Sequence, residues 1–143
     1  MESNQSKTKV YAWGIGSDGQ LGHQNLSGKS KCCMLPHLVQ KQPKGVVAIS
    51  CYSLSSFALN DQGQVFGFGN GSRGRIGLGE GNDQVKIPTQ VKELVNIVQI
   101  SAGTFHSLAL DSNGQAFSTG CNNYGELGRP TDAKVVSIFG KVE

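Results

Sequence analysis

The feature that most constrains the fold of this chain is a glycine-rich segment that occurs three times. The copies align without gaps and read VYAWGIGSDGQLG at 10–22, VFGFGNGSRGRIG at 65–77 and AFSTGCNNYGELG at 116–128. Three glycine columns run through all copies: Gly14, Gly69 and Gly120; Gly19, Gly74 and Gly125; and Gly22, Gly77 and Gly128. A repeated unit of this kind indicates that one supersecondary element is stacked several times along the chain.

A second segment recurs in the same order between the glycine motifs. Residues 48–66 align with residues 99–117 at a constant offset of 51, and the glycine motifs start at 10, 65 and 116. Short apolar runs alternate with Asp-x-x-Gly and Asn-Gly turns, which is the chemistry of β-hairpins, and no helical periodicity is present. A period near 50 residues with this character predicts a β-propeller or a similar radial array of short antiparallel strands.

The glycine motif also fits G-x-G-x-x-G, the pattern of a dinucleotide-binding loop. The third copy, however, has Asn122 in place of the second glycine. A phosphate loop needs this second glycine for close backbone approach, and it needs an α-helix behind it. Residues 75–81 follow the second copy and show no helical pattern. The glycines are therefore interpreted as structural turn residues, and no cofactor is predicted.

The repeat resembles that of the regulator of chromosome condensation family over about residues 10–128. The matching residues are Gly103-Thr104-Phe105-His106-Ser107-Leu108-Ala109-Leu110, then Gly114, Gly120, Asn122, Gly125, Leu127 and Gly128. The resemblance implies a seven-bladed propeller of four-stranded blades, of which this chain supplies a part. Three interpretations follow: a piece of a longer propeller, a ring completed by propeller blades from other chains, or an open arc whose edge strands a partner covers.

The chain is thus expected to have three segments. A flexible N-terminal lead covers 1–9, propeller repeats cover 10–128, and an incomplete further blade or tail covers 129–143. Trp13 aligns with Phe68 and is predicted to be buried between blades. The segment containing Pro36-x-x-Val39 and its counterpart Pro88-x-x-Val91 is interpreted as a connection between repeated blocks.

Composition favours a cytoplasmic or nuclear protein. The first nine residues are polar and lack the apolar core of a secretory signal, and no apolar run reaches the length of a membrane span. Four cysteines are interpreted as reduced thiols: Cys32, Cys33, Cys51 and Cys121. The arrangement His23-x8-Cys32-Cys33-x3-His37 matches no standard zinc finger, so no metal site is predicted.

No nucleophile–base pair stands out, so no catalytic residue is predicted and partner binding is the expected role. Candidate contacts in the glycine motif are the variable side chains of Asp18, Arg73, Arg75 and Tyr124, although the arginines are equally consistent with solvated charges. The resemblance implies that His106 contributes to contact with a small GTPase. The alternative for His106 is a ring that hydrogen-bonds the backbone of a neighbouring blade.

A basic loop at 23–45 carries lysines and no acidic residue. Lys29 and Lys31 are its candidate contacts, accompanied by Lys41 and Lys44. Such a loop suits an acidic protein surface or nucleic-acid phosphates. A solvated, lysine-rich loop is the favoured interpretation, because no aromatic side chain is interleaved with the lysines.

The sequence predicts a protein-interaction module that acts as a scaffold or regulatory subunit without chemistry of its own. The resemblance adds an alternative, guanine-nucleotide exchange on a Ran-like small GTPase. A third hypothesis is chromatin or nucleic-acid association through the basic loop. No small-molecule substrate is predicted.

Overall fold

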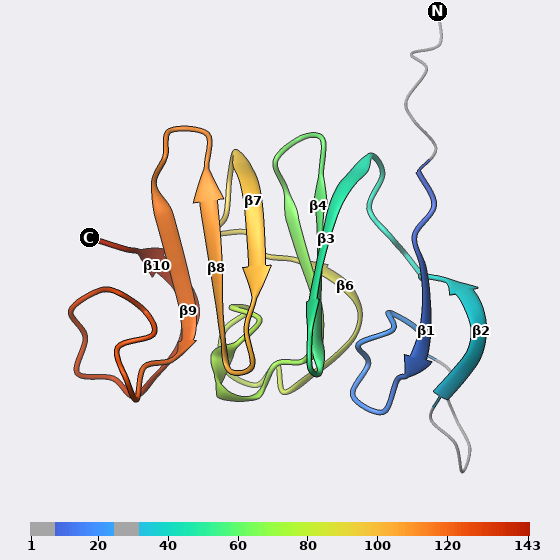
Figure 1. Cartoon of the computed structure of the whole chain (residues 1–143), viewed down its shortest axis with the longest axis horizontal. Coiled ribbons are helices and arrows are strands. Elements are labelled where there is room, and N and C mark those ends of the chain that lie inside the picture. Colours follow the sequence, from blue (N-terminus) through green and yellow to red (C-terminus); the bar gives the residue numbers. More distant parts are fainter. Residues whose placement is uncertain (1–7, 25–31) are drawn as a thin grey trace, which may run out of the picture.

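Regular structure in the chain is almost entirely β, which confirms the predicted all-β class. The structure is a computed structural model that describes residues 8–24 and 32–143 (Figure 1). The strands are β1 (Tyr11–Ile15), β2 (Cys32–Leu38), β3 (Val46–Tyr52), β4 (Ser55–Asn60), β5 (Val65–Asn70), β6 (Gln84–Gln90), β7 (Ile97–Ala102), β8 (His106–Asp111), β9 (Ala116–Cys121) and β10 (Val135–Lys141). One short 3₁₀ turn, η1 (Ser72–Gly74), follows β5.

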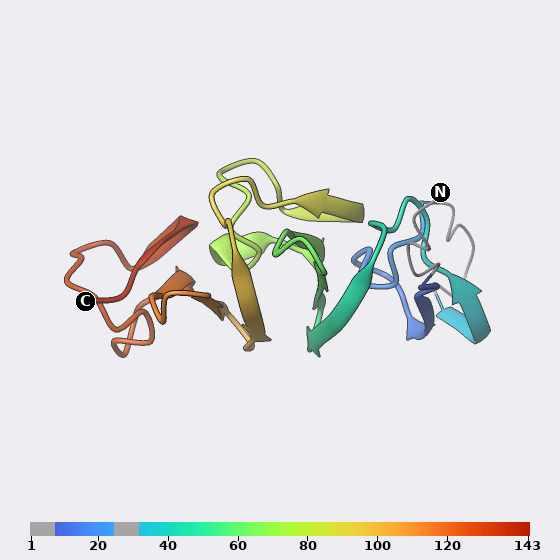
Figure 2. The same ribbon diagram turned by 90° about the horizontal axis from the view of Figure 1, so that it is seen from above.

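The strands form three antiparallel sheets that lie side by side. Two sheets have four strands, in the orders β3-β4-β5-β6 and β10-β9-β8-β7, and the described part of the first sheet holds β1 and β2. Figure 2 shows the sheets following one another along an open arc, with β3 and β7 facing each other across the boundary between the two four-stranded sheets. This arrangement is a partial propeller, as predicted, and each four-stranded sheet is one blade.

The β4–β5 and β8–β9 hairpins form because their turns satisfy the backbone locally. The side-chain oxygen of Asn60 accepts hydrogen bonds from the N–H groups of Gln62 and Gln64. Asp111 repeats this geometry with the N–H groups of Asn113 and Gln115. The glycine between the two donors has positive φ in both turns, a conformation that glycine adopts without steric cost.

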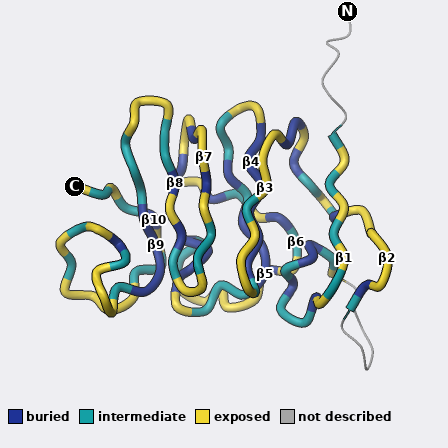
Figure 3. The backbone as a smooth tube through the Cα atoms, in the orientation of Figure 1, coloured by how far each residue is buried: buried dark blue, intermediate teal, exposed yellow. Residues whose placement is uncertain are grey.

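The core lies within and between the two complete blades. Every residue of β4 is buried, because β3 and β5 flank it within its sheet and β7 of the next blade packs against it (Figure 3). Phe57, Val65 and Ile76 are almost completely shielded from solvent and join one hydrophobic cluster with Ile97 and Ile100 of the next blade. By contrast, the strands of the first sheet are largely exposed.

The outer strands differ from the sequence prediction. Pro36 lies in β2 and Pro88 in β6, where a connection was expected. Proline is tolerated there because both are outermost strands of their sheets. Likewise, β10 in the segment 129–143 does not begin a further blade but completes the sheet of β7, β8 and β9. The blades are therefore out of phase with the sequence repeat, which begins at the third strand of a blade.

Trp13 is not buried, contrary to the prediction. Its side chain is 62% exposed, whereas the aligned Phe68 and Thr119 are buried. The reason is the neighbourhood of each strand: β5 and β9 each lie between two strands, while β1 pairs with β2 alone in the described part of the chain. Burial at this position of the repeat therefore requires the inner strands of the blade to be present.

Candidate functional site

The turns that follow β1, β5 and β9 lie at the same end of the sheets as the β3–β4 and β7–β8 turns, at the bottom of Figure 1. This end is called the rim. All nine glycines of the three columns have positive φ, between 58° and 108°, so they shape the rim turns. No α-helix follows any of these turns in the described residues. The arrangement therefore lacks the helix N-terminus of a dinucleotide site.

Arg75 connects two blades at the rim and is neither a solvated charge nor a free contact residue. Its side chain is 3% exposed. The guanidinium donates to the backbone oxygen of Ser72 at 2.9 Å, to the Ser72 hydroxyl at 3.0 Å and to the backbone oxygen of Thr104 at 2.8 Å. Burial lowers the pKa of Arg75, and the neighbouring Arg73 charge lowers it further. Its role is to join the β5–β6 turn to the β7–β8 turn.

Arg73 is the exposed cation of this boundary. Its guanidinium carbon lies 4.8 Å from the centroid of the Phe105 ring, and Nη1 lies 4.0 Å from Sγ of Cys121. The guanidinium of Arg75 lies at the same distance from this ring. Two cations therefore share one aromatic side chain, which holds Arg73 in place without neutralising it.

His106 and Glu126 lie beside this group. The pKa of Glu126 is lowered chiefly because the backbone N–H of Tyr124 donates to Glu126 Oε2 at 2.8 Å. His106, which begins β8 and is half-buried, adds a smaller electrostatic lowering. The expected alternative for His106, a hydrogen bond from its ring to a neighbouring blade, is not formed with any described residue.

Tyr124 and Asp18 occupy the same column as Arg73 but differ in environment. Tyr124 is 94% exposed. Asp18 is half-buried at the preceding blade boundary, where it accepts hydrogen bonds from Asn70 at 2.8 Å and from the Ser17 hydroxyl at 2.6 Å. Asp18 therefore joins two repeats and is not part of the group around Arg73. That group is called the rim cluster and comprises Arg73, Phe105, His106, Tyr124 and Glu126.

Sequence reasoning missed Phe105, which holds the centre of the rim cluster. The signal was its alignment with Leu54: both copies place a large apolar residue in the turn between the first two strands of a blade. Phe105 remains 40% exposed.

The lysines of the basic loop and the histidines near Cys32 and Cys33 form no defined site among the described residues. Lys29 and Lys31 lie outside the described residues, and Lys41 and Lys44 are exposed. The His23 and His37 rings approach to 6.1 Å between centroids. However, no group of three or more potential metal ligands occurs among residues 8–24 and 32–143. A search of the same residues finds no helix long and apolar enough to cross a membrane.

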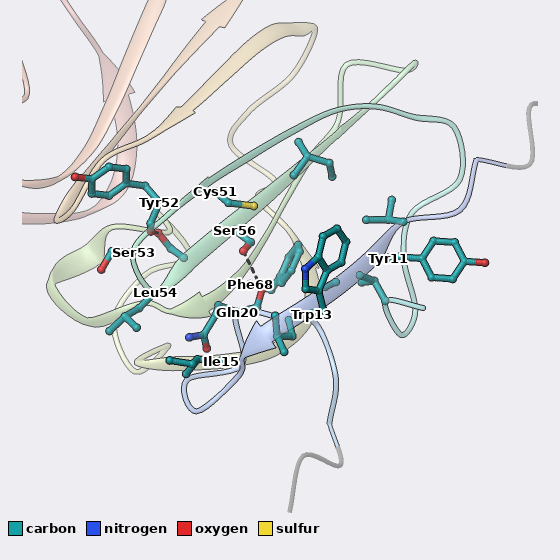
Figure 4. A pocket seen from close by; sticks show the side chains of 16 residues that line it. Tyr11, Trp13, Ile15, Gln20, Cys51, Tyr52, Ser53, Leu54, Ser56 and Phe68 are labelled. Carbon is teal, nitrogen blue, oxygen red and sulfur yellow. Dashed lines mark hydrogen bonds between the residues drawn. The ribbon is translucent and has the colours of Figure 1, made fainter. Parts of the chain in front are cut away.

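A cleft beside β1 is a second feature that the sequence did not reveal. Its volume is about 520 Å³, and it separates β1 from β3 and β4 (Figure 4). The lining is mostly apolar and includes Trp13, Ile15, Ile49, Tyr52 and Leu54. The cleft lies between the first sheet and the β3–β6 blade, whereas the rim cluster lies between the two complete blades, and the two features share no residue.

Comparison with known proteins gives one consistent family. The sequence profile of the regulator of chromosome condensation (RCC1) repeat matches residues 8–59 and 62–110, and a second profile of this repeat matches 46–75 and 97–126. Mouse protein RCC2 is 33% identical over 139 residues, which cover 94% of this chain and 26% of RCC2. Human E3 ubiquitin-protein ligase HERC2 is 36% identical over 126 residues, covering 85% of this chain and 3% of the ligase.

Solved propellers agree with this fold. Human WBSCR16 superposes with a TM-score of 0.81 at 27% identity, covering 94% of this chain and 34% of WBSCR16. Prp20p of Saccharomyces cerevisiae superposes with a TM-score of 0.84 at 20% identity, covering 95% and 34%. The chain thus spans about a quarter of the length of RCC2 and a third of these propellers.

Proposed function

The chain belongs to the family of regulator of chromosome condensation (RCC1) repeat proteins, and from this premise we propose that it is a protein-interaction module. It acts as a scaffold or regulatory subunit and binds its partner at the rim cluster. The module needs no catalytic group, because a rigid propeller edge presents its turns as a fixed surface.

The observation that carries the proposal is the environment of Arg73. This cation is exposed at a blade boundary, and its contacts are an aromatic ring and a thiol rather than a carboxylate. A charge that is held in place but not neutralised attracts an acidic segment of a partner. Tyr124 adds a large exposed aromatic side chain, the type that is enriched at protein interfaces.

Site-specific photo-crosslinking in cells tests this function. A benzophenone amino acid in place of Tyr124 is expected to crosslink a defined protein partner, and Arg73→Glu is expected to abolish the product. The same photo-reactive residue in place of Val95, which is exposed in the connection before β7, serves as the matched control. A partner that crosslinks equally from both positions, or that tolerates Arg73→Glu, rules out the rim cluster as the binding surface.

A second candidate is guanine-nucleotide exchange on a Ran-like small GTPase. The half-buried His106 begins β8 at the rim, and the family resemblance implies that this position contributes to contact with a GTPase. Release of labelled guanine nucleotide from the GTPase, with the chain at substoichiometric concentration, distinguishes the two functions. Faster nucleotide release that is lost in the His106→Ala variant supports exchange activity. A release rate that the chain does not change supports the interaction module instead.

A further inference from the structure

The rim cluster and the buried Arg75 beside it place two guanidinium groups against one aromatic ring. The guanidinium carbons of Arg73 and Arg75 each lie 4.8 Å from the centroid of the Phe105 ring. We infer that this pair of cations binds a phosphorylated serine or threonine side chain of a partner protein in preference to a carboxylate. The inference rests on the proposed function, because it names the chemistry that the same surface recognises.

The preceding blade boundary shows that the fold does not need a buried cation at this position. The uncharged Gln20 holds the repeat position of Arg75. The backbone oxygens of both residues accept a hydrogen bond from a buried serine of the following blade, at 2.9 Å and 2.8 Å. The side chain of Arg75 also donates to Ser72 and Thr104, but these bonds require donors and not a net charge. Because burial of a charge is costly, the cation at Arg75 is better explained by a ligand than by the joint between blades.

Arg73 lacks the polar counterpart that its equivalent has at the preceding boundary. Asp18 holds the repeat position of Arg73 and receives a hydrogen bond from Asn70 at 2.8 Å. The position of Asn70 is taken by Cys121, whose Sγ lies 4.0 Å from Nη1 of Arg73. A thiol is a weak acceptor, whereas a guanidinium has several N–H donors. The exposed guanidinium therefore has donors to offer to an incoming anion.

The two cations repel each other, and a dianion relieves this repulsion better than a single charge. Burial lowers the pKa of Arg75, the Arg73 charge lowers it further, and the Asp18 carboxylate opposes this lowering less than Arg73 adds to it. A phosphate monoester carries about 1.5 to 2 negative charges at neutral pH and has three strong acceptor oxygens. Hydrogen bonds between a guanidinium and such an anion are among the strongest that side chains form. A phosphorylated side chain therefore gains more from this pair than a carboxylate does.

The neighbouring turns restrict the ligand to one isolated phosphate. Among the three glycine turns only the second carries arginines, while the first carries Asp18 and the third carries Glu126. A nucleic-acid backbone is bound by a groove of cations that follows successive phosphates. Acidic side chains on both sides of the cations oppose such a polyanion. The partner segment therefore carries one phosphate among neutral or basic residues.

Two fluorescein-labelled peptides test the ligand directly. Both have the sequence Gly-Ala-Ala-X-Ala-Ala-Gly, where X is phosphoserine in one and glutamate in the other. Fluorescence anisotropy with the full chain is expected to show at least about tenfold tighter binding of the phosphoserine peptide. Equal binding of the two peptides, or binding of neither, overturns the inference. A labelled single-stranded oligonucleotide that binds more tightly than the phosphoserine peptide also overturns it and assigns the cations to nucleic acid.

Matched variants test the two cations. Arg75→Gln introduces the residue that the preceding boundary carries and is expected to weaken binding of the phosphoserine peptide at least about fivefold. Arg73→Gln, at an exposed side chain, is expected to do the same and keeps the test open if Arg75→Gln fails to fold. Lys92→Gln removes one exposed charge in the connection between β6 and β7 and should leave binding unchanged. Binding that both arginine variants retain, or that Lys92→Gln weakens equally, contradicts the assignment to this pair.

Phosphatase treatment separates this inference from the proposed function. The photo-crosslink from the Tyr124 position is repeated in cell extract that has been treated with a protein phosphatase and in untreated extract. Loss of the crosslinked product after treatment supports a phosphorylated partner. A product that persists overturns the inference and leaves the interaction module in place. Absence of the product from both extracts contradicts the proposed function, and this inference with it.

Discussion

Ser107 donates its side-chain hydroxyl to the backbone oxygen of Arg75 at 2.8 Å, across the boundary between two blades. The same bond joins Ser56 to the backbone oxygen of Gln20 one repeat earlier, at 2.9 Å. Both serines are buried at the same position of the repeat, in β8 and β4. The serine column thus connects the rim turn of one repeat to the inner strand of the next blade.

Ser107→Ala is expected to lower the free energy of unfolding by about 1–2 kcal/mol, because the buried carbonyl of Arg75 loses this donor. Urea denaturation monitored by circular dichroism measures the change. Ser112→Ala, at an exposed turn position, should leave stability unchanged. If the two variants unfold alike, the bond across the boundary does not contribute to stability.

Ile100→Ala and Ile49→Ala are expected to differ strongly although the residues are equivalent in the repeat. Removing the buried Ile100 side chain leaves a cavity between blades and should cost about 2–4 kcal/mol. The half-exposed Ile49 loses little shielding, so its replacement should cost less than about 1 kcal/mol. Thermal and urea unfolding of the two variants provide the comparison, and equal losses would contradict the assignment of Ile49 to an uncovered surface.

The repeat was predictable because its signals are local. The glycine columns adopt positive φ, and Asn60 and Asp111 close hairpin turns with their own side chains. The glycine turns and the hairpin turns can therefore be predicted from the local sequence, without knowledge of the partner strand. The outer strands were missed because Pro36 and Pro88 suggest a connection, and only their position at a sheet edge makes them compatible with a strand.

The site was less predictable because burial in a propeller depends on the adjacent blade. Arg73 and Arg75 look alike in the sequence, yet one is exposed and the other is fixed by the turn between β7 and β8. Trp13 looks like Phe68 but lacks the strands that cover the phenylalanine. Such differences arise from contacts between residues in different repeats, which the alignment of copies does not contain.

Gly74→Ala should destabilise the chain more than Gly125→Ala. Both glycines have positive φ, which costs an alanine roughly 1–2 kcal/mol. A Cβ on Gly74 would also lie 2.5 Å from the backbone oxygen of Val136, whereas no atom lies within 4 Å of that position at Gly125. The collision with β10 should add at least about 1 kcal/mol to the loss. Equilibrium unfolding measures both, and equal losses would indicate that β10 is not packed on this turn.

Acid should loosen the rim turn at 122–126. The pKa of Glu126 lies below its ordinary value of 4.5, first because the backbone N–H of Tyr124 donates to the carboxylate. A lowered pKa means that the carboxylate stabilises the folded turn fully above pH 4.5 and loses this effect as the pH falls through the lower, folded pKa. The amide resonance of Tyr124, followed by NMR, should therefore titrate with a midpoint below 4.5. Glu126→Gln keeps an acceptor but not the charge and should remove the titration. A midpoint at or above the ordinary value would show that the hydrogen bond does not form in solution.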